Sequence, residues 1–486
     1  MRITFIVPYA TALVMDSNRP FGGIETRSWT LAQELAKDTE LHISYVVSHH
    51  VKQSFILNNV RIETYQPVHP ALESEICADT DLICTFGVNI PSAEAIYYAH
   101  RKSIPSILFL ASYTDLQETY RYGSDYINFY NISGHLCSYS LSYASKIIVQ
   151  TTDQQETLKQ FFQRDSFLLR NPAPDWPLEK TSTKPYVLWI GRTGDLPKRP
   201  QLLVEIAKQL PSLQFKMIVN EFKDSLGFQE LKKLAPSNVE IIEPVAFSEI
   251  PQYFSNCFAF VNTSAKDNEG FPNTLLQAAA SNKPVISLSI DPDKLFTEQA
   301  CGVFCDNSIS HAVTAIQEAH EGGLAEFQEN FKAKIEAQHK LEDLSQNLIN
   351  EFKSIQYLPS LEALSFDFFD TPKIKILKAF LQEKILRYQS KGKIAFFPYG
   401  RHSFSLVKLL GQDFINWHFI DDNKSLKAKN IKLSSTEHFQ DATIDYVFLS
   451  SDAPSPNMKK KAEELFGNKL IEIYPSFLGS GPFLNL

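Results

Sequence analysis

One segment of the chain combines a carboxylate, a glycine and the start of a helix. It reads NEGFPNTLLQAAASNKPVIS over residues 268–287, and its pattern predicts that Glu269 lies in a loop after a buried strand. The following helix leaves its first backbone amides, at Asn273 to Leu275, without partners inside the helix, and such amides favour an anion. The Glu269 carboxylate can accept hydrogen bonds from sugar hydroxyls, and Gln277 lies eight residues further along. This element is therefore suited to hold a phosphate, a sugar and a ribose together.

Two cations follow a strand in an earlier segment, WIGRTGDLPKRPQLLVEIAKQL, over residues 189–210. When a bond to a phosphate breaks, negative charge grows on the leaving group, and fixed cations aimed at it lower the barrier without a metal. Arg192 can grip two oxygens at once, whereas Lys198 supplies a point charge. Either residue alone would more often be a solvated surface cation. Their pairing with the 268–287 segment favours a diphosphate site.

A third segment, FGGIETRSWTLAQELA over residues 21–36, places two glycines before a helical pattern. Gly22 and Gly23 permit a positive φ and a close approach of the backbone to a phosphate or sugar. A Gly-Gly pair by itself is more often a plain turn. We assign the Gly-Gly pair to the same site because it precedes the other two segments in the expected order along the chain.

Together these segments resemble the motifs of the family 4 retaining glycosyltransferases of GT-B fold, including the Glu-x7-Glu signature. The resemblance implies that Glu269 lies beside the donor sugar and that position 277 reaches the ribose of the nucleotide. It assigns catalytic roles to Glu269, Arg192 and Lys198, and donor binding to Gly22, Gly23, Gly270, Phe271, Asn273, Thr274, Leu275 and Gln277. The chain departs from the signature at position 277, where a glutamine stands in place of glutamate. A neutral amide accepts hydrogen bonds less strongly than a carboxylate, which bears on donor affinity.

The resemblance implies transfer of a sugar, with retention, from a nucleotide-diphosphate-sugar to a glycan, lipid-linked or small-molecule acceptor. It implies no metal and no cofactor, and it suggests a place in polysaccharide biosynthesis. Two alternatives stay open, a non-catalytic nucleotide-sugar binding module and another GT-B enzyme such as a nucleotide-sugar epimerase. The binding module is motivated by Gln277 and by LFLASYTD (108–115), which lacks the histidine that many family members carry there. His135, further along, is expected to be structural.

Two acidic triplets imitate the Asp-x-Asp metal motif of other glycosyltransferases, Asp79-Thr80-Asp81 and Asp291-Pro292-Asp293. Such pairs arise easily by chance in loops, so no metal site is assigned. The many tyrosines of YTDLQETYRYGSDYINFYN (113–131) suit stacking on the rings of an acceptor sugar, and equally suit a packed loop.

These candidate residues need a scaffold, and the chain of 486 residues is long enough for several domains. Apolar β-type runs alternate with helical patterns in three successive blocks, which predicts parallel sheets. We expect an α/β protein in which two Rossmann-like domains face each other across a cleft, with a smaller third Rossmann-like domain. The predicted ranges are 1–170 for the acceptor domain, 181–356 for the donor domain and 372–486 for the accessory domain. The Pro-rich stretch 171–185 is expected to link the first two.

The third block lies outside the glycosyltransferase resemblance. It is similar to small Rossmann-like domains appended to sugar-modifying enzymes, but Gly400 stands alone without the full glycine fingerprint. A structural or partner-docking module is therefore favoured over a cofactor site. Before it, residues 372–393 form a basic amphipathic pattern, which indicates either a membrane-surface contact or a helix that packs Ile374, Leu377 and Leu381 against a domain.

Composition narrows the class of protein further. The formal charge of -8 gives no field for gathering nucleic acid, so nucleic acid is excluded as a partner. Six scattered cysteines without a C-x-x-C pair indicate reduced thiols. The apolar start, interrupted by Pro8, does not resemble a signal peptide, and no apolar run reaches the ~20 residues of a membrane span. We expect a cytoplasmic protein, with peripheral contact at the inner membrane face as the open alternative.

Overall fold

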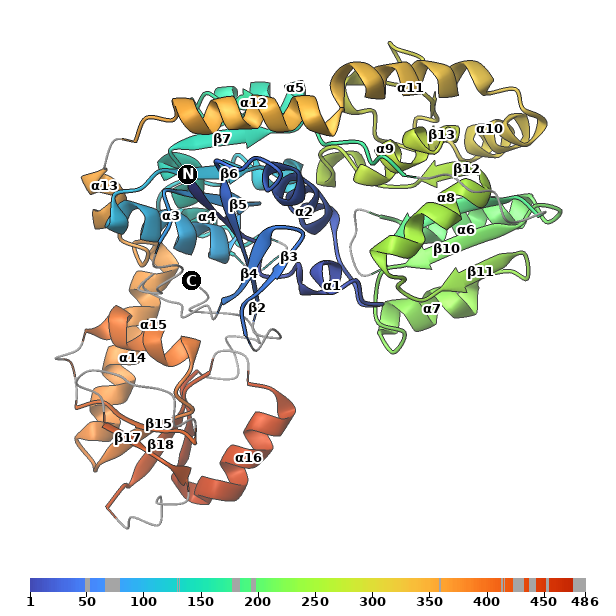
Figure 1. Ribbon diagram of the computed structural model, residues 1–486. Coiled ribbons are helices and arrows are strands. Elements are labelled where there is room, and N and C mark those ends of the chain that lie inside the picture. The colour runs from blue at the N-terminus through green and yellow to red at the C-terminus, as the bar shows by residue number, and fades with distance from the viewer. Residues whose placement is uncertain are drawn as a thin grey trace. The chain divides into compact units, whose positions relative to one another are not determined.

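The chain forms two compact units, each described by itself (Figure 1). The computed structural model describes residues 1–48, 53–65, 79–128, 130, 132–176, 184–193, 198–357, 360–411, 414, 416–422, 432–436, 443–451 and 454–474. Unit 1 comprises Met1–Gln66, Ile76–Gln117 and Leu141–Pro359. Unit 2 comprises Pro67–Glu75, Glu118–Ser140 and Ser360–Leu486.

The first half of unit 1 is built on an eight-stranded sheet with the order β3-β4-β2-β1-β5-β6-β7-β8. All neighbouring strands are parallel except β3 and β4, which pair antiparallel. The strands are β1 (Arg2–Ile6), β2 (His42–Ser48), β3 (Phe55–Leu57), β4 (Val60–Tyr65), β5 (Leu82–Phe86), β6 (Ser106–Phe109), β7 (Lys146–Val149) and β8 (Phe167–Leu168). Every residue of β5 is buried, as a central strand covered on both faces requires.

Helices cover this sheet, and polar side chains cap the starts of two of them. The helices are α1 (Thr11–Val14), α2 (Gly23–Leu35), α3 (Ile90–Lys102), the 3-10 turn η1 (Tyr113–Asp115), α4 (Gly134–Tyr143), which crosses into unit 2, and α5 (Thr152–Phe162). The Asn89 side chain accepts the Ser92 amide at 2.9 Å at the start of α3, and Thr151 caps α5 through the Gln154 amide. These contacts satisfy amides that have no partner within the helix.

The second half of unit 1 has a six-stranded sheet with the order β11-β10-β9-β12-β13-β14, in which every pair is parallel. Its strands are β9 (Tyr186–Gly191), β10 (Phe215–Val219), β11 (Val239–Ile242), β12 (Cys257–Asn262), β13 (Val285–Ser287) and β14 (Val303–Phe304). Its helical elements are α6 (Pro200–Gln209), α7 (Leu226–Leu234), η2 (Phe247–Glu249), α8 (Ile250–Asn256), η3 (Lys266–Asn268), α9 (Asn273–Ala280), η4 (Pro292–Lys294), α10 (Ile309–Glu321) and α11 (Ala325–Gln338). Two buried hydrophobic clusters lie in this half, and together they include residues from both faces of β9.

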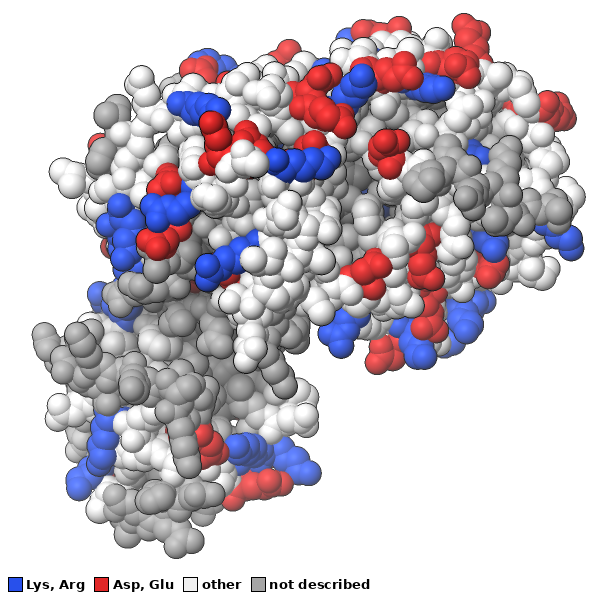
Figure 2. All heavy atoms as spheres, in the orientation of Figure 1, with Lys and Arg blue, Asp and Glu red and all other residues white. Residues whose placement is uncertain are grey.

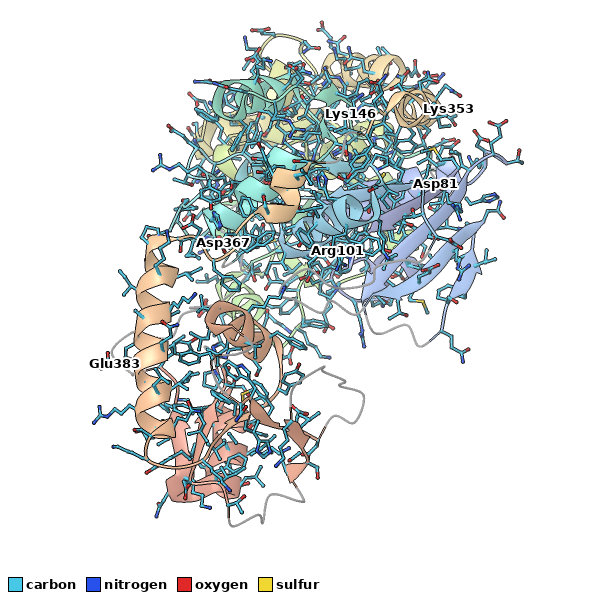
Figure 3. All side chains as sticks on the ribbon, turned by 90° about the vertical axis from the view of Figure 1, so that its left-hand side faces the viewer. Asp81, Arg101, Lys146, Lys353, Asp367 and Glu383 are labelled. Atoms are coloured by element: carbon cyan, nitrogen blue, oxygen red, sulfur yellow. The ribbon has the colours of Figure 1, made fainter. Side chains whose placement is uncertain are left out.

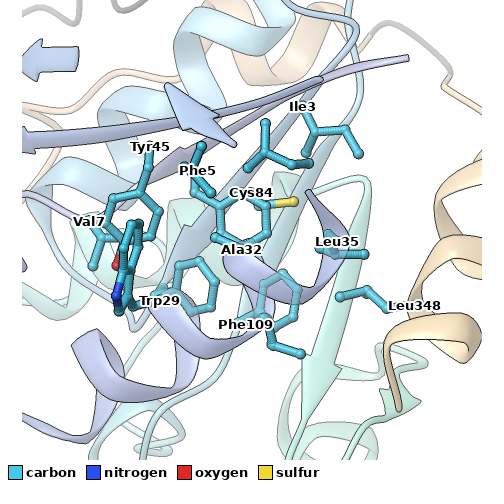
Figure 4. Packing of buried hydrophobic residues seen from close by; sticks show 14 of the residues in the cluster. Ile3, Phe5, Val7, Trp29, Ala32, Leu35, Tyr45, Cys84, Phe109 and Leu348 are labelled. Carbon is cyan, nitrogen blue, oxygen red and sulfur yellow. The ribbon is translucent and has the colours of Figure 1, made fainter. Parts of the chain in front are cut away.

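The end of the range predicted for the donor domain, 181–356, forms two helices, α11 and α12 (Leu341–Ser354). The second of them packs in the first half of unit 1: Leu344 and Leu348 are buried in one cluster with Ile3 and Leu35 (Figure 4). Lys146 of β7 also forms an ion pair with Glu351 of α12, and Lys353 lies 3.6 Å from the Glu40 carboxylate (Figure 3). The chain therefore crosses back to the first sheet, because the apolar stripe of α12 is buried there.

Unit 2 contains a five-stranded parallel sheet with the order β17-β16-β15-β18-β19. Its strands are β15 (Ile394–Phe397), β16 (His418–Ile420), β17 (Lys432–Ser434), β18 (Tyr446–Leu449) and β19 (Leu470–Glu472), and its helices are α13 (Leu361–Ser365), α14 (Pro372–Gln389), α15 (Arg401–Leu410), α16 (Pro456–Phe466) and the 3-10 turn η6 (Gly467–Lys469). Ile374, Leu377 and Leu381 of α14 are buried in its core. The packing alternative is thus confirmed for these three side chains, which are not available to a membrane surface.

The α/β class and the parallel sheets are confirmed, and the structure adds strands that the sequence did not reveal. These are the edge strands β3, β8, β14 and β17, and β4, which lies between β3 and β2. In the described part of the chain, no helix is long and apolar enough to span a membrane. None of the five described cysteines is in a disulfide bond, and all five are buried. Basic and acidic side chains are mixed over the face seen in Figure 2.

A substitution in α12 tests its docking on the first sheet. Leu348 is fully buried, so Leu348→Ala should lower the free energy of unfolding by about 2–5 kcal/mol. Asn347→Ala, at an exposed position of the same helix, should leave it nearly unchanged. Equilibrium denaturation of both variants checks this, and equal stabilities would contradict the docking.

Candidate functional site

The loops that carry the predicted cations and carboxylate leave the same edge of the second sheet. Arg192 directly follows β9, and Glu269 follows β12, which pairs with β9 in parallel. The carboxyl ends of neighbouring parallel strands lie together, which is where open α/β sheets bind ligands. The sheet topology thus brings two of the three sequence segments to one place.

Lys198 and Glu269 form an ion pair across this edge. The Lys198 Nζ lies 2.6 Å from the Glu269 Oε1, with side chains 22% and 16% exposed. Both groups are therefore partly shielded but still reachable from solvent. This contact joins the 189–210 segment to the 268–287 segment, as the sequence predicts.

Arg192 lies against the Gly-Gly segment of the first half. A Cβ atom at Gly22 would stand 3.5 Å from the Arg192 Nη2 and 2.6 Å from the Glu25 Oε2. Gly22 itself is extended at φ -127, and Gly23 does not have a positive φ either. The expectation of a left-handed backbone there is wrong. The other predicted reason, a close approach to a phosphate or sugar, stays a prediction. A Cβ atom at position 22 would require the Glu25 side chain to shift.

Two asparagines of the second half hold the backbone of this glycine segment. Asn273, the first residue of α9, donates from Nδ2 to the Gly23 carbonyl at 2.9 Å. Asn220, after β10, accepts the Phe21 amide at 3.3 Å and donates to the Phe21 carbonyl. The sequence predicted Asn273 as a site residue and missed Asn220, because a single Asn after a strand carries no distinctive pattern.

The start of α9 offers fewer free amides than the sequence predicts. The Leu275 amide donates to the Pro272 carbonyl at 3.1 Å, so it is not available to an anion. Among the described residues, the amides of Asn273 and Thr274 have no partner. Phe271 and Leu275 are buried in the hydrophobic core, and the Phe271 amide and carbonyl are bonded to Gln150 and Asn171. The side chains of these two predicted donor-binding residues therefore serve packing.

Gln277 lines a small cavity between the two halves of unit 1. Asn273 also lines it, and the other lining residues are Thr26, Arg27, Thr30, Pro172, Pro174 and Phe247. The cavity is thus bounded by α2, the chain after β8 and the second half. Burial lowers the pKa of Arg27 to about 9, and its guanidinium donates to the carbonyls of Leu110 and Leu169. Arg27 is therefore a fixed donor in the wall of this cavity.

A buried amide network supports the glycine at position 270. The Gln150 Oε1 accepts the Phe271 amide, and Asn171 Nδ2 donates to Gln150, to the Phe271 carbonyl and to Asn273 Oδ1 at 2.8 to 3.1 Å. A Cβ atom at Gly270 would lie 2.9 Å from the Gln154 Nε2. Sequence reasoning missed Gln150, Gln154 and Asn171, whose spacing along the chain shows no motif.

Glu221, another residue that the sequence did not indicate, holds the loop of Arg192. The Glu221 carboxylate accepts the Thr193 amide at 2.6 Å and also the hydroxyl of Thr193, and it accepts Ser225 Oγ at 3.0 Å. A Cβ atom at Gly227 would stand 2.2 Å from the Thr193 Oγ1. Glu221 and the empty space at Gly227 together fix Thr193, and through it the neighbouring Arg192. Residues 194–197 of this loop lie outside the described residues.

The carboxylates of the two acidic triplets pair with other residues of the protein. Arg2 pairs with Asp79 and Asp81 at 3.3 and 2.8 Å, and Asp293 accepts Thr152 and forms an ion pair with Arg170. Within the described ranges no group of three or more His, Cys, Asp or Glu side chains could hold a metal ion.

The loop after β6, where the sequence lacks a histidine, contacts the loop of Glu269. The Ala111 carbonyl lies 3.1 Å from the Cβ position of Gly270. Asp115 holds this loop by accepting the Ala111 and Val88 amides at 2.6 and 2.9 Å, and burial raises the pKa of its carboxyl. Its peptide groups therefore border the site beside Glu269.

Two Rossmann-like halves with a site at the strand ends define a protein of GT-B fold. Within it, residues 184–321 match the family model of the glycosyl transferases, group 1. This segment includes Arg192, Lys198, Glu269 and Gln277, and it is similar to the domain that this family shares. No curated protein sequence matches the chain.

Solved structures of glycosyltransferases share the fold. Sucrose-phosphate synthase from Thermosynechococcus elongatus aligns with a TM-score of 0.58 at 14% identity, over 73% of this chain and 98% of that chain. HepE from Anabaena, in complex with UDP and glucose, aligns with a TM-score of 0.54 at 15% identity, over 73% and 100%. A TarM mutant of S. aureus, in complex with Fondaparinux, alpha-GlcNAc-glycerol and UDP, has a TM-score of 0.52 at 13% identity, over 73% and 100%. At these identities the likeness establishes the fold.

Gly227 offers a test of how the Arg192 loop is held. Gly227→Ala should collide with Thr193 and lower the free energy of unfolding by about 1–3 kcal/mol, the usual cost of overpacking a filled site. Leu226→Ala, at the exposed neighbouring position, is the control and should leave the free energy of unfolding nearly unchanged. Equilibrium denaturation measures both, and equal stabilities would contradict the role of Gly227.

His339 gives unit 1 a pH dependence. It is buried against Phe271, its Nδ1 lies 2.7 Å from the Asn171 carbonyl, and burial lowers its pKa from 6.5 to about 4. The unfolded chain binds the proton first, so stability should fall by about 3 kcal/mol as the pH drops from 6.5 to 4. His339→Gln should show a flatter decline in denaturant titrations over this window. His42→Gln, at an exposed histidine, should retain the steep decline, and parallel curves for all three proteins would refute this role.

Proposed function

We propose that this protein is a retaining glycosyltransferase that transfers a sugar from a nucleoside-diphosphate-sugar to a glycan. The observation that carries the proposal is the Lys198–Glu269 ion pair at the strand ends of the second sheet. Arg192 follows β9 at the same edge and lies against position 22, and α9 begins at Asn273, just after the loop of Glu269. These groups combine two cations, a helix start and one carboxylate, the set that a sugar joined to a diphosphate requires. The group 1 family match over the same residues supports it.

The ion pair reduces the repulsion between negative charges in such a site. A carboxylate that contacts the donor sugar stands close to the diphosphate, and two like charges in a partly shielded site repel each other. Lys198, 2.6 Å from Glu269, offsets the charge of that carboxylate and can also face the phosphate oxygens. Glu269 thereby stays available to accept hydrogen bonds from the sugar hydroxyls.

In the proposed reaction the glycosidic bond to the diphosphate breaks as the acceptor hydroxyl attacks the same face of the sugar. The leaving phosphate takes the proton of that hydroxyl, so the new bond has the configuration of the old one. Arg192, Lys198 and the α9 amides stabilise the charge that grows on the diphosphate, and these fixed donors take the part that a metal plays in other sites. Gln277, in its cavity, would bond the ribose hydroxyls as a neutral partner.

UDP is the nucleotide in the HepE and TarM structures, which makes UDP-sugars the first donors to test. TarM was solved with glycans, and its likeness to this chain in fold supports a glycan as acceptor. A place in polysaccharide biosynthesis follows from that acceptor class.

Turnover of UDP-sugars tests the function. Glu269→Ala should abolish transfer while the melting temperature stays near that of the unchanged protein, and Arg192→Ala should lower kcat/KM by the equivalent of about 2–4 kcal/mol. Product chromatography and the anomeric NMR signals of the new linkage are the measurements. An inverted anomer would overturn retention. UDP-sugar binding without turnover on any acceptor would instead identify a binding module, and unchanged turnover in Glu269→Ala would remove the proposed site.

A further inference from the structure

Unit 2 contains an exposed tyrosine surface that the site in unit 1 does not explain. Tyr122, Tyr126, Ile127 and Tyr130 are 55%, 41%, 40% and 58% exposed. Tyr120 and Tyr139 of the same segment are buried. The tyrosine-rich stretch is therefore divided: some rings are packed into unit 2, and the others face solvent. We name the exposed set Tyr122, Tyr126 and Tyr130 the tyrosine surface.

The loop beneath these rings is built from buried polar contacts. The Asn128 side chain accepts the amides of Tyr130 and Ile132 at 2.9 and 3.0 Å and donates to the Tyr120 hydroxyl at 3.0 Å. Asn128 is 8% exposed, so it holds the loop from inside. A chain that bends around a buried asparagine in this way presents its outer side chains in fixed positions.

His135 clamps the loop to residues that precede α14. The Gly123 amide donates to its Nδ1 at 2.9 Å, so the neutral ring carries its proton on Nε2, which donates to the Asp367 carbonyl at 2.7 Å. The ring is fully buried, and burial lowers the pKa of His135, which keeps it in this neutral form. The Tyr122 hydroxyl also donates to Asp370 at 2.5 Å. His135 is thus structural, and the tyrosine surface is fixed before any partner arrives.

Charged residues of both signs occur in the segments of unit 2 that form and hold this surface. Glu118, Asp125, Asp367 and Asp370 are acidic, and Arg121, Lys373 and Lys375 are basic. An anionic membrane attracts clusters of Lys and Arg, and a phosphorylated partner needs an Arg-rich site. A mixed set of this kind favours an uncharged partner with many hydroxyl groups.

We propose that the tyrosine surface binds the acceptor glycan, so that unit 2 is a carbohydrate-binding module for a neutral saccharide chain. A tyrosine ring has a negative face that attracts the C–H groups of a sugar ring, and its hydroxyl bonds the sugar edge. The Tyr122 hydroxyl is held by Asp370 and the Tyr126 ring packs against Tyr120, so part of the ordering cost of binding is already met in the free protein. That the bound glycan is the acceptor rests on the proposed transfer reaction. That unit 2 binds a glycan does not depend on that reaction.

The test compares the full-length protein with a Tyr126→Ala, Tyr130→Ala double variant, which leaves the Tyr122 and Asn128 contacts in place. The matched control is Ile376→Ala, Leu386→Ala, which removes two exposed apolar side chains from α14 of the same unit. The probes are immobilised neutral oligosaccharides of glucose, mannose, galactose and N-acetylglucosamine, and vesicles of phosphatidylglycerol. Thermal melting establishes that every variant is folded.

We expect the unchanged protein and the control to bind at least one oligosaccharide, and the double tyrosine variant to bind it about tenfold or more weakly, as expected when aromatic anchors are truncated. Tyr126→Phe, Tyr130→Phe should retain most of the binding, because the rings remain. In the transfer reaction the tyrosine variant should raise KM for the glycan and leave kcat and donor hydrolysis unchanged.

Several outcomes would overturn the proposal. They are an absence of binding to every oligosaccharide, equal binding by the tyrosine variant, and binding to vesicles that the tyrosine variant alone loses. Binding that disappears in the tyrosine variant of a protein without any UDP-sugar turnover would support the glycan surface and refute the transferase. The two proposals can therefore fail separately.

Discussion

The Lys198–Glu269 ion pair is the interaction on which the candidate site of unit 1 depends. In the proposed function Glu269 stands near the diphosphate, and Lys198, 2.6 Å away, offsets the charge of its carboxylate. Neighbouring elements of the second half position Lys198 and Glu269. β9 and β12 are neighbouring strands, so the loops that carry Lys198 and Glu269 leave the same edge of the sheet. Glu221 fixes the loop after β9 through Thr193.

The contacts on the glycine segment connect the site to the first half of unit 1. Asn220 and Asn273 bond the backbone of Phe21 and Gly23 rather than any side chain. A Cβ atom at Gly22 would stand 2.6 Å from the Glu25 Oε2, whereas one at Gly23 would lie 3.5 Å from the Asn273 Nδ2, an ordinary contact. Of the two glycines, Gly22 is therefore the one whose missing side chain the packing uses.

Unit 2 shows a different use of similar chemistry. Its buried Asn128 and His135 make no contact that suggests catalysis, since both bond the backbone and keep a surface loop in shape. The neutral state of His135 follows from burial and from its two backbone partners. A lone histidine of this kind is a structural part, and its effect on function would be exerted through the tyrosines that it helps to fix.

The sequence by itself determined the α/β class, the three sheets and the central strands, because hydrophobic periodicity and turn residues depend on neighbours a few positions away. It also indicated Arg192, Lys198, Glu269 and Asn273, which stand in contiguous motifs. The tertiary structure alone decided what joins distant segments: the return of α12 to the first sheet, the occupied amide of Leu275 and the placement of residues 118–140 in unit 2. Asn171, Asn220 and Glu221 belong to the same group. Their amides and carboxylate act on backbone far away along the chain, and an isolated polar residue gives no local sign of its partner.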